Sequence, residues 1–156
     1  MPTTPKVLIA YTSLTGNTEE AAFLLKKELE KIGAQVDIDE LEMLSPRKYL
    51  DQDICIVATY SYDSGGEVLP DEAQGFFQEL GGLDLTEKVF GVIGSGQDFY
   101  EWYCGAVDRF EEQFEKAGAR KGAMSMKFEW DISTPEDQTK LLAFATDLIE
   151  AYQEKV

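Results

Sequence analysis

Short, uninterrupted apolar runs alternate along this chain with longer segments whose apolar residues recur at helical spacing. Runs that are apolar throughout indicate strands buried on both faces, as in a parallel sheet covered by helices on either side. Glycines at positions 33, 81, 82 and 118 mark the ends of helical segments. The pattern predicts strands over 6–11, 35–41, 53–59, 88–94 and 123–130, helices over 17–32, 70–80, 102–117 and 135–152, and a short helix over 45–50 capped by Ser45.

This strand–helix alternation predicts one α/β domain over residues 1–156. Right-handed crossovers give a three-layer α/β/α architecture, in which a doubly wound, five-stranded parallel sheet lies between two helical layers. Ligands of such sheets bind beyond the carboxyl ends of the strands, where the strand order reverses. The loops that follow Tyr11, Ala58 and Gly94 are therefore the candidate ligand site.

Charge and composition exclude several functions. The net charge is −16, which disfavours nucleic acid and anionic membranes because both would repel the protein. The chain has no histidine, so it cannot form a Ser-His-Asp or Cys-His catalytic site or a His-based zinc site, and two cysteines cannot form a Cys₄ site. Cys55 lies in an apolar run and is interpreted as a small core residue. No segment has the length of a signal peptide core or a membrane span, so we expect a cytoplasmic protein that binds no membrane.

The first loop combines hydroxyl groups with the start of a helix. Thr12 is followed by Ser13, Leu14, Thr15, Gly16, Asn17 and Thr18. Hydroxyl donors, a glycine that allows close approach and the free amides of a helix N-terminus together can cradle a phosphate. The absence of Lys and Arg from the loop favours a monophosphate over a nucleoside triphosphate. The alternative is a hydroxyl-rich helix cap that binds no ligand.

The loop SLTGNT resembles the T-x-T-G-N-T phosphate loop of the flavodoxins. The resemblance extends over the chain, because residues 58–67 (ATYSYDSGGE) and 94–105 (GSGQDFYEWYCG) resemble the other two cofactor loops of that family. It implies the strand order 2-1-3-4-5 and non-covalently bound flavin mononucleotide (FMN). No long insertion interrupts residues 124–130, so the chain resembles the short-chain class.

The resemblance also implies roles for individual residues. Tyr62 would stack on the inner face of the isoalloxazine and Tyr100 on its outer face, although ordinary packing of these rings is the alternative. Backbone groups of Gly96, Gln97 and Cys104 would bind the flavin O2, and the Trp102 carbonyl would accept from N3–H. The expected contact set is completed by Thr59, Tyr60, Ser61, Asp63, Ser64, Ser95 and Tyr103.

Three of these residues differ from the usual family pattern. Tyr62 stands where many flavodoxins have Trp, and Gln97 stands where Asp is common. Asp63 stands where many have Gly, next to a peptide that flips on reduction to offer its carbonyl to flavin N5–H. Asp tolerates the flipped conformation less well than Gly.

The resemblance implies a low-potential one-electron carrier, with no substrate turnover of its own, that shuttles mainly between the neutral semiquinone and the hydroquinone. Negative charge near the flavin would lower the potential of the second couple. We expect a monomer that docks onto basic-surfaced redox proteins, such as flavodoxin/ferredoxin–NADP reductases or 2-oxoacid oxidoreductases. The acids expected to steer docking are Asp63, Glu67, Asp71, Glu72, Asp98 and Glu101.

Three alternatives share the topology. One is an NAD(P)H-dependent FMN or quinone reductase, and another is a flavodoxin-like activator of a metalloenzyme. A phosphoacceptor receiver domain is disfavoured, because Thr12-Ser13 and Ala58-Thr59 stand where it would need acids.

Overall fold

The computed structural model describes residues 4–12, 17–60, 73–95, 105–128 and 134–154. Its strands are β1 (Lys6–Tyr11), β2 (Gln35–Glu40), β3 (Ile54–Tyr60), β4 (Val89–Ser95), β5 (Arg120–Lys121) and β6 (Met126–Phe128). Its α-helices are α1 (Asn17–Lys31), α2 (Gln74–Gly81), α3 (Gly105–Lys116) and α4 (Pro135–Glu154), and two 3₁₀-helices are η1 (Leu41–Met43) and η2 (Pro46–Asp51). The predicted helical residues 70–72 and 102–104 lie outside the described part.

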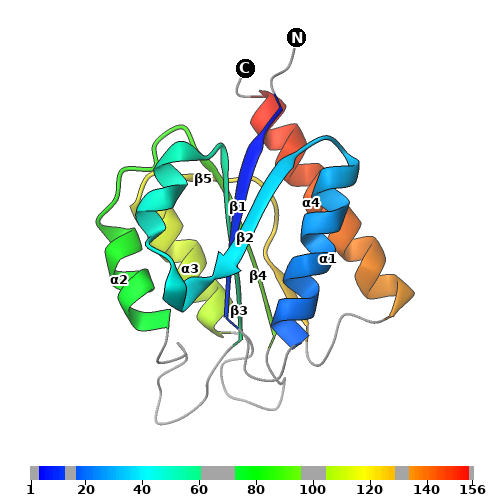
Figure 1. Ribbon diagram of the computed structural model, residues 1–156, viewed down its shortest axis with the longest axis horizontal. Coiled ribbons are helices and arrows are strands. Elements are labelled where there is room, and N and C mark those ends of the chain that lie inside the picture. Colours follow the sequence, from blue (N-terminus) through cyan, green and yellow to red (C-terminus); the bar gives the residue numbers. More distant parts are fainter. Residues whose placement is uncertain (1–3, 13–16, 61–72, 96–104, 129–133, 155–156) are drawn as a thin grey trace.

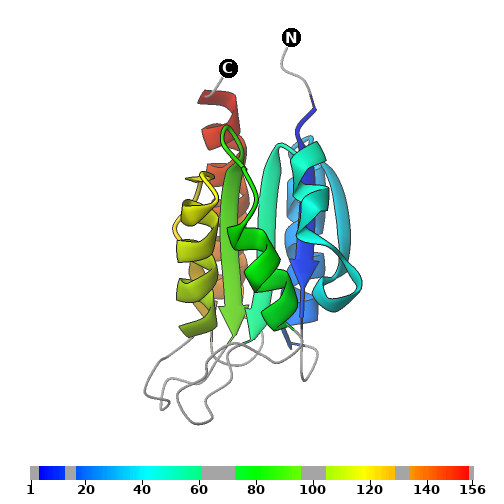
Figure 2. The ribbon, with the colours of Figure 1, turned by 90° about the vertical axis from the view of Figure 1, so that its left-hand side faces the viewer.

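The sheet has the predicted order, β2-β1-β3-β4-β5, with β6 also paired to β4. All described pairings are parallel, with Val7 opposite both Val36 and Ile54 and with Ala58 opposite Ile93. Helices α1 and α4 cover one face, and α2 and α3 cover the other (Figures 1 and 2). The three-layer α/β/α prediction is therefore confirmed.

The fifth strand differs from its prediction over 123–130, of which residues 129 and 130 lie outside the described part. Its place at the edge is taken by two short strands, β5 and β6, which both pair with β4. The chain leaves the strand at Gly122, whose backbone passes so close to β4 that a Cβ there would lie 2.3 Å from Val89 Cγ1. Glu111 on α3 accepts hydrogen bonds from both Lys121 and Ser125, which holds the interruption against the helix.

Alternate strand residues point into two separate cores. Val7, Ile9 and Ile56 pack with α1 and α4. Leu8 and Val57 pack with α2 and α3, together with Cys55, which is buried as predicted. Complete burial of aliphatic side chains on both faces stabilises the sheet by about 1.5–3 kcal/mol per side chain, and it explains why the central strands read as continuous apolar runs.

The ends of several elements follow from local chemistry. Gly33 and Gly118 adopt φ of 101° and 94° just after α1 and α3, the left-handed conformation that ends helices. Ser45 caps η2 as predicted, since its Oγ accepts from the Arg47 amide at 3.2 Å. Strand β2 ends at Glu40 rather than at the predicted Leu41, because Leu41 begins η1 and packs in the opposite core. Among the described helices, none combines the length and hydrophobicity that a membrane span requires.

Candidate functional site

The carboxyl ends of β1, β3 and β4 meet at one edge of the sheet. Tyr11, the last residue of β1, lies opposite Ala58, and Tyr60 at the end of β3 lies opposite Ser95 at the end of β4. The first residue of α1, Asn17, and the first residue of α3, Gly105, follow β1 and β4, so both helix N-termini lie at this same edge (Figure 2). The segments predicted to bind a ligand therefore all leave the sheet from adjacent, parallel strands.

Part of the predicted site falls within the described residues. Thr12, Thr18, Thr59 and Tyr60 are described with their side chains, while Asn17 opens α1 and Ser95 ends β4. The others lie outside the described residues, so their contacts stay predictions: Ser13, Leu14, Thr15, Gly16, Ser61, Tyr62, Asp63, Ser64, Gly96, Gln97, Tyr100, Trp102, Tyr103 and Cys104. The same holds for the predicted steering acids Glu67, Asp71, Glu72, Asp98 and Glu101.

Buried hydroxyl groups replace apolar side chains at this edge. Among the described residues, the buried polar side chains are Thr12, Thr18 and Thr59. The Thr12 amide donates to the Ala58 carbonyl at 2.9 Å, and Thr59 Oγ1 donates to the Tyr60 carbonyl at 2.9 Å. Within the described part, every buried side-chain nitrogen and oxygen has a hydrogen-bond partner, so the edge is a satisfied polar layer over the apolar core.

Tyr11 joins the end of β1 to the first turn of α1. Its buried ring makes an edge contact with Phe23 at 5.9 Å, and its hydroxyl donates to Glu19 Oε1 at 3.2 Å. Burial, followed by the carboxylates of Glu19, Glu40 and Asp39, raises the pKa of Tyr11 to about 12. Tyr11 is therefore a neutral donor at all physiological pH values, and it fixes the distance between β1 and the helix start.

Gly94 lets β3, β4 and α3 approach one another just before their loops. A Cβ on Gly94 would lie 2.3 Å from Val107 Cγ2 and 2.6 Å from the Thr59 carbonyl oxygen. Real Cβ contacts are essentially never that short, so only glycine is compatible with this spacing. The sequence marks Gly94 as part of a loop motif, whereas the structure shows that it sets the packing beneath the loop.

The donor set at this edge fits a phosphate monoester. The N-terminus of a helix offers amides that have no partner within the helix, together with a partial positive charge. Thr12 and Thr18 flank the loop that enters α1 at this point. The described residues hold no grouping of three or more Cys, Asp or Glu that could bind a metal ion. The start of α1, flanked by Thr12 and Thr18, fits the phosphate end of FMN.

Comparison with known protein families matches residues 9–144 to the flavodoxins. The chain belongs to the flavodoxin family. Flavodoxins bind FMN and act as electron-transfer proteins rather than as enzymes with a substrate of their own. The predicted family, cofactor and fold are confirmed.

Solved structures and a curated relative agree with this membership. The flavodoxin of Streptococcus pneumoniae TIGR4 is 41% identical, with a TM-score of 0.88, over 93% of this chain and 98% of that one. Oxidised flavodoxin 2 of Bacillus cereus is 36% identical, with a TM-score of 0.86, over 97% of this chain and 99% of that one. The flavodoxin of Maridesulfovibrio salexigens is 32% identical over 132 residues, which are 84% of this chain and 90% of that protein.

Some relatives carry the flavodoxin fold as one part of a longer reductase. The sulfite reductase [NADPH] flavoprotein alpha-component of Bacillus subtilis is 25% identical over 83% of this chain, but the match covers only 22% of that protein. The similarity to such reductases is therefore confined to their flavodoxin-like part.

Proposed function

We propose that this flavodoxin is a low-potential one-electron carrier that shuttles mainly between the neutral semiquinone and the hydroquinone of FMN. The observation that carries the proposal is the convergence of the β1, β3 and β4 ends with the N-terminus of α1 at one polar edge. The helix N-terminus at that edge supports binding of a phosphate, and family membership supports FMN as its source. We further propose that the chain works as a cytoplasmic monomer built from one domain, residues 1–156.

The proposed cofactor contacts follow the three loops. The phosphate would bind Ser13, Thr15, the amides of Leu14, Gly16 and Asn17, and the flanking Thr12 and Thr18. The isoalloxazine would lie between Tyr62 and Tyr100, since a flat tricycle is best desolvated by flat partners. Its pyrimidine edge would bind backbone groups of Gly96, Gln97, Trp102 and Cys104, with Thr59, Tyr60, Ser61, Asp63, Ser64, Ser95 and Tyr103 around it.

Charge supports the low potential. The protein has a net charge of −16, and the proposed phosphate loop contains no cation to offset the bound dianion. One negative charge about 12 Å from the flavin disfavours a further electron by about 1.4 kcal/mol at an effective dielectric of about 20. For a one-electron couple that energy corresponds to about 59 mV. Several such charges lower the second couple by a few times that value, although salt screens the exposed ones.

An anaerobic reductive titration of the FMN-loaded protein tests this proposal. We expect a blue intermediate with absorbance near the red end of the visible spectrum, followed by bleaching at a much lower potential. Direct bleaching without a coloured intermediate would contradict the proposed redox range. The apoprotein titrated with FMN and with riboflavin provides the matching binding test, since only FMN carries the phosphate.

A second candidate function is that of an NAD(P)H-dependent flavin reductase. The resemblance to the flavodoxin-like part of NADPH-linked reductases supports it. The two candidates differ in one assay: a reductase oxidises NADPH without any other protein, whereas a carrier requires a partner. We propose basic-surfaced reductases and 2-oxoacid oxidoreductases as those partners, because a protein of charge −16 associates faster with a basic face.

A further inference from the structure

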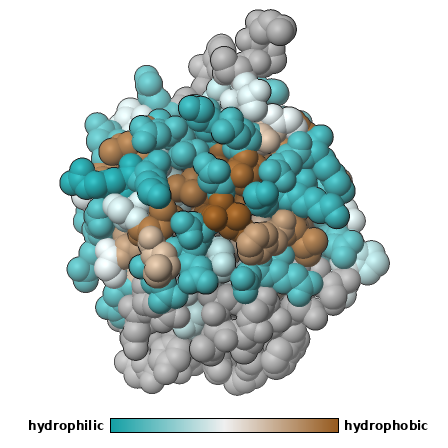
Figure 3. Space-filling view, in the orientation of Figure 1, coloured by the Kyte–Doolittle hydropathy of each residue, from teal (hydrophilic) through white to brown (hydrophobic). Residues whose placement is uncertain are grey.

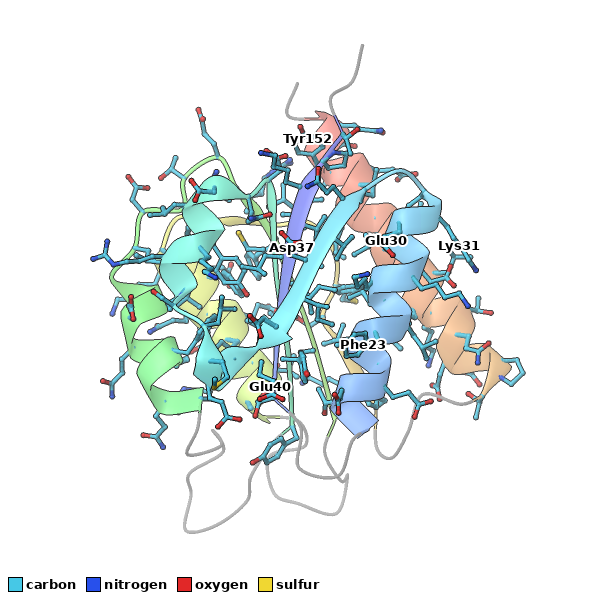
Figure 4. All side chains as sticks on the ribbon, viewed as in Figure 1. Phe23, Glu30, Lys31, Asp37, Glu40 and Tyr152 are labelled. Carbon is cyan, nitrogen blue, oxygen red and sulfur yellow. The ribbon has the colours of Figure 1, made fainter. Side chains whose placement is uncertain are left out.

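The carboxyl end of β2 lies between α1 and η1 and carries exposed apolar side chains. Phe23 on α1 is 47% exposed and Met43 on η1 is 74% exposed. Figure 4 shows Phe23 and Glu40 on the same face of the molecule, and Figure 3 shows hydrophobic side chains gathered on that face among hydrophilic ones. We call the residues Glu19, Glu20, Phe23, Asp39, Glu40, Glu42 and Met43 the β2-end surface.

The carboxylates of the β2-end surface are not neutralised. All five are exposed, and among the described residues none of them forms an ion pair with Lys or Arg: Glu19, Glu20, Asp39, Glu40 and Glu42. Some exposed acids elsewhere have a cation within reach, such as Glu30 with Lys26 at 3.1 Å and Asp108 with Lys127 at 2.9 Å, whereas others in the described part, such as Asp51, form no ion pair. The β2-end surface is thus a concentrated source of negative potential.

Phe23 is exposed but held in place. Its ring packs edge-on against Tyr11 at 5.9 Å, and the Tyr11 hydroxyl is fixed by Glu19 at 3.2 Å. A half-exposed aromatic ring that is already ordered loses little conformational freedom on binding, which is the property of an interface anchor. Met43 adds an adaptable apolar contact on the other side of the β2 end.

A hollow of about 250 Å³ extends this surface along β2. It is lined by Leu8, Asp37, Ile38, Asp39, Leu44, Lys48 and Gln52. Leu8 and Leu44 contribute apolar side chains to this lining, and Asp37 and Asp39 contribute carboxylates. This combination suits the long apolar stem and cationic head of an arginine or lysine side chain, although Lys48 also contributes a positive charge to the lining.

We propose that the β2-end surface is a docking site for a redox partner whose contact face has an apolar centre and a basic rim. The proposal rests on the proposed carrier function. Charge complementarity selects this occupant, because a second copy of the chain or an anionic membrane would bring like charges together. An apolar anchor within a polar rim is also the usual anatomy of a protein interface.

The test uses the FMN-loaded protein and a flavodoxin–NADP reductase with a basic contact face, driven by NADPH and followed by flavin absorbance. Variants F23A and M43A remove the apolar anchors, and E40K reverses one charge. Matched controls on α4 are L142A, whose parent side chain is 43% exposed, and E150K, whose parent is also exposed. Visible spectra and FMN dissociation constants are recorded for every variant. These measurements distinguish weaker binding of the reductase from weaker binding of FMN.

We expect KM for F23A to rise about tenfold with little change in kcat, because an anchor contributes to association and not to the electron-transfer step. M43A should raise KM by a smaller factor, E40K should flatten the salt dependence of kcat/KM, and both α4 controls should match the wild type.

Unchanged KM in F23A, M43A and E40K, with normal reduction of the wild type, would overturn this docking site alone. If the reductase did not reduce the wild-type protein, both the proposed carrier function and the proposed docking site would be refuted. Self-association of the wild type in sedimentation, abolished in F23A, would assign the surface to a second copy instead.

Discussion

Replacing Gly94 by alanine should disturb both stability and FMN binding, because this position sets the spacing of three elements. The new Cβ would lie 2.3 Å from Val107 Cγ2 and 2.6 Å from the Thr59 carbonyl oxygen. Val107 is completely buried, and the Thr59 carbonyl belongs to the backbone of a central strand, so neither can rotate away. The methyl group can be accommodated only if α3 or β3 moves away from β4.

Overpacking of a dense core costs about 1–3 kcal/mol, and we expect the upper end here because one of the clashing atoms is backbone. With a urea m-value of about 2 kcal/mol/M, a loss of about 3 kcal/mol lowers the unfolding midpoint by about 1.5 M. The same movement displaces the loops proposed to hold the flavin ring. We therefore expect the affinity of the apoprotein for FMN, measured by quenching of flavin fluorescence, to fall at least about tenfold.

Two other glycines provide controls for G94A. In G91A the Cβ would meet the ends of two side chains, Phe144 Cζ at 2.7 Å and Leu148 Cδ2 at 3.0 Å. This variant should lose about 1 kcal/mol of stability while FMN affinity stays unchanged. A methyl group added at Gly75 in α2 would have no atom within 4 Å, so G75A should gain about 0.5–1 kcal/mol. A G94A protein with the wild-type urea midpoint and FMN affinity would refute the reasoning.

Three further substitutions test other parts of the structure. The pKa of Tyr11 is raised from 10.0 to about 12, so the folded protein loses stability once pH exceeds 10, when only the unfolded chain loses this proton. At pH 11 the wild type should have lost more stability than Y11F in urea titrations, by at most about 1.4 kcal/mol because solvent screens part of the effect. Y49F removes a buried hydroxyl that donates to the Ile56 carbonyl at 2.5 Å, and calorimetry should show a loss of about 1–3 kcal/mol. G118A forces a side chain into φ of 94° with Thr86 Oγ1 at 2.9 Å, whereas Gly33 at φ of 101° has open space; G118A should therefore lower Tm by more than the about 2–8 °C expected for G33A.

Most of the fold could be predicted because the central strands are apolar on both faces. β1 matches its predicted bounds, and β3 and β4 differ by a residue at each end. β5 could not be predicted, because Arg120 and Lys121 show no apolar pattern and pair with β4 through long-range bonds such as the Arg120 amide to the Lys88 carbonyl at 2.9 Å. η1 could not be predicted either. Val36 and Ile38 pack with one core, and their alternation does not indicate that the side chain of Leu41 packs in the other core.

The location of the site could be predicted from topology, since the three loops follow adjacent parallel strands. Spacing along the chain does not, however, indicate which distant residues touch. The contact of Gly94 with Val107 depends on the angle at which α3 crosses β4. The bond from Tyr11 to Glu19 depends on how far α1 begins from the strand end. These packing relations position the loops, and they emerge only when the layers are assembled.

The division of the interior into two cores has a consequence for how this protein tolerates change. Neighbouring residues of β1, such as Val7 and Leu8, point to opposite faces of the sheet and belong to different cores. Substitutions in the two cores should therefore have nearly additive energies, although the residues are adjacent in sequence. Each helical layer can therefore accumulate substitutions without compensating substitutions in the other layer. Residues that must change together are then expected within the shared sheet, among those paired by the strand register.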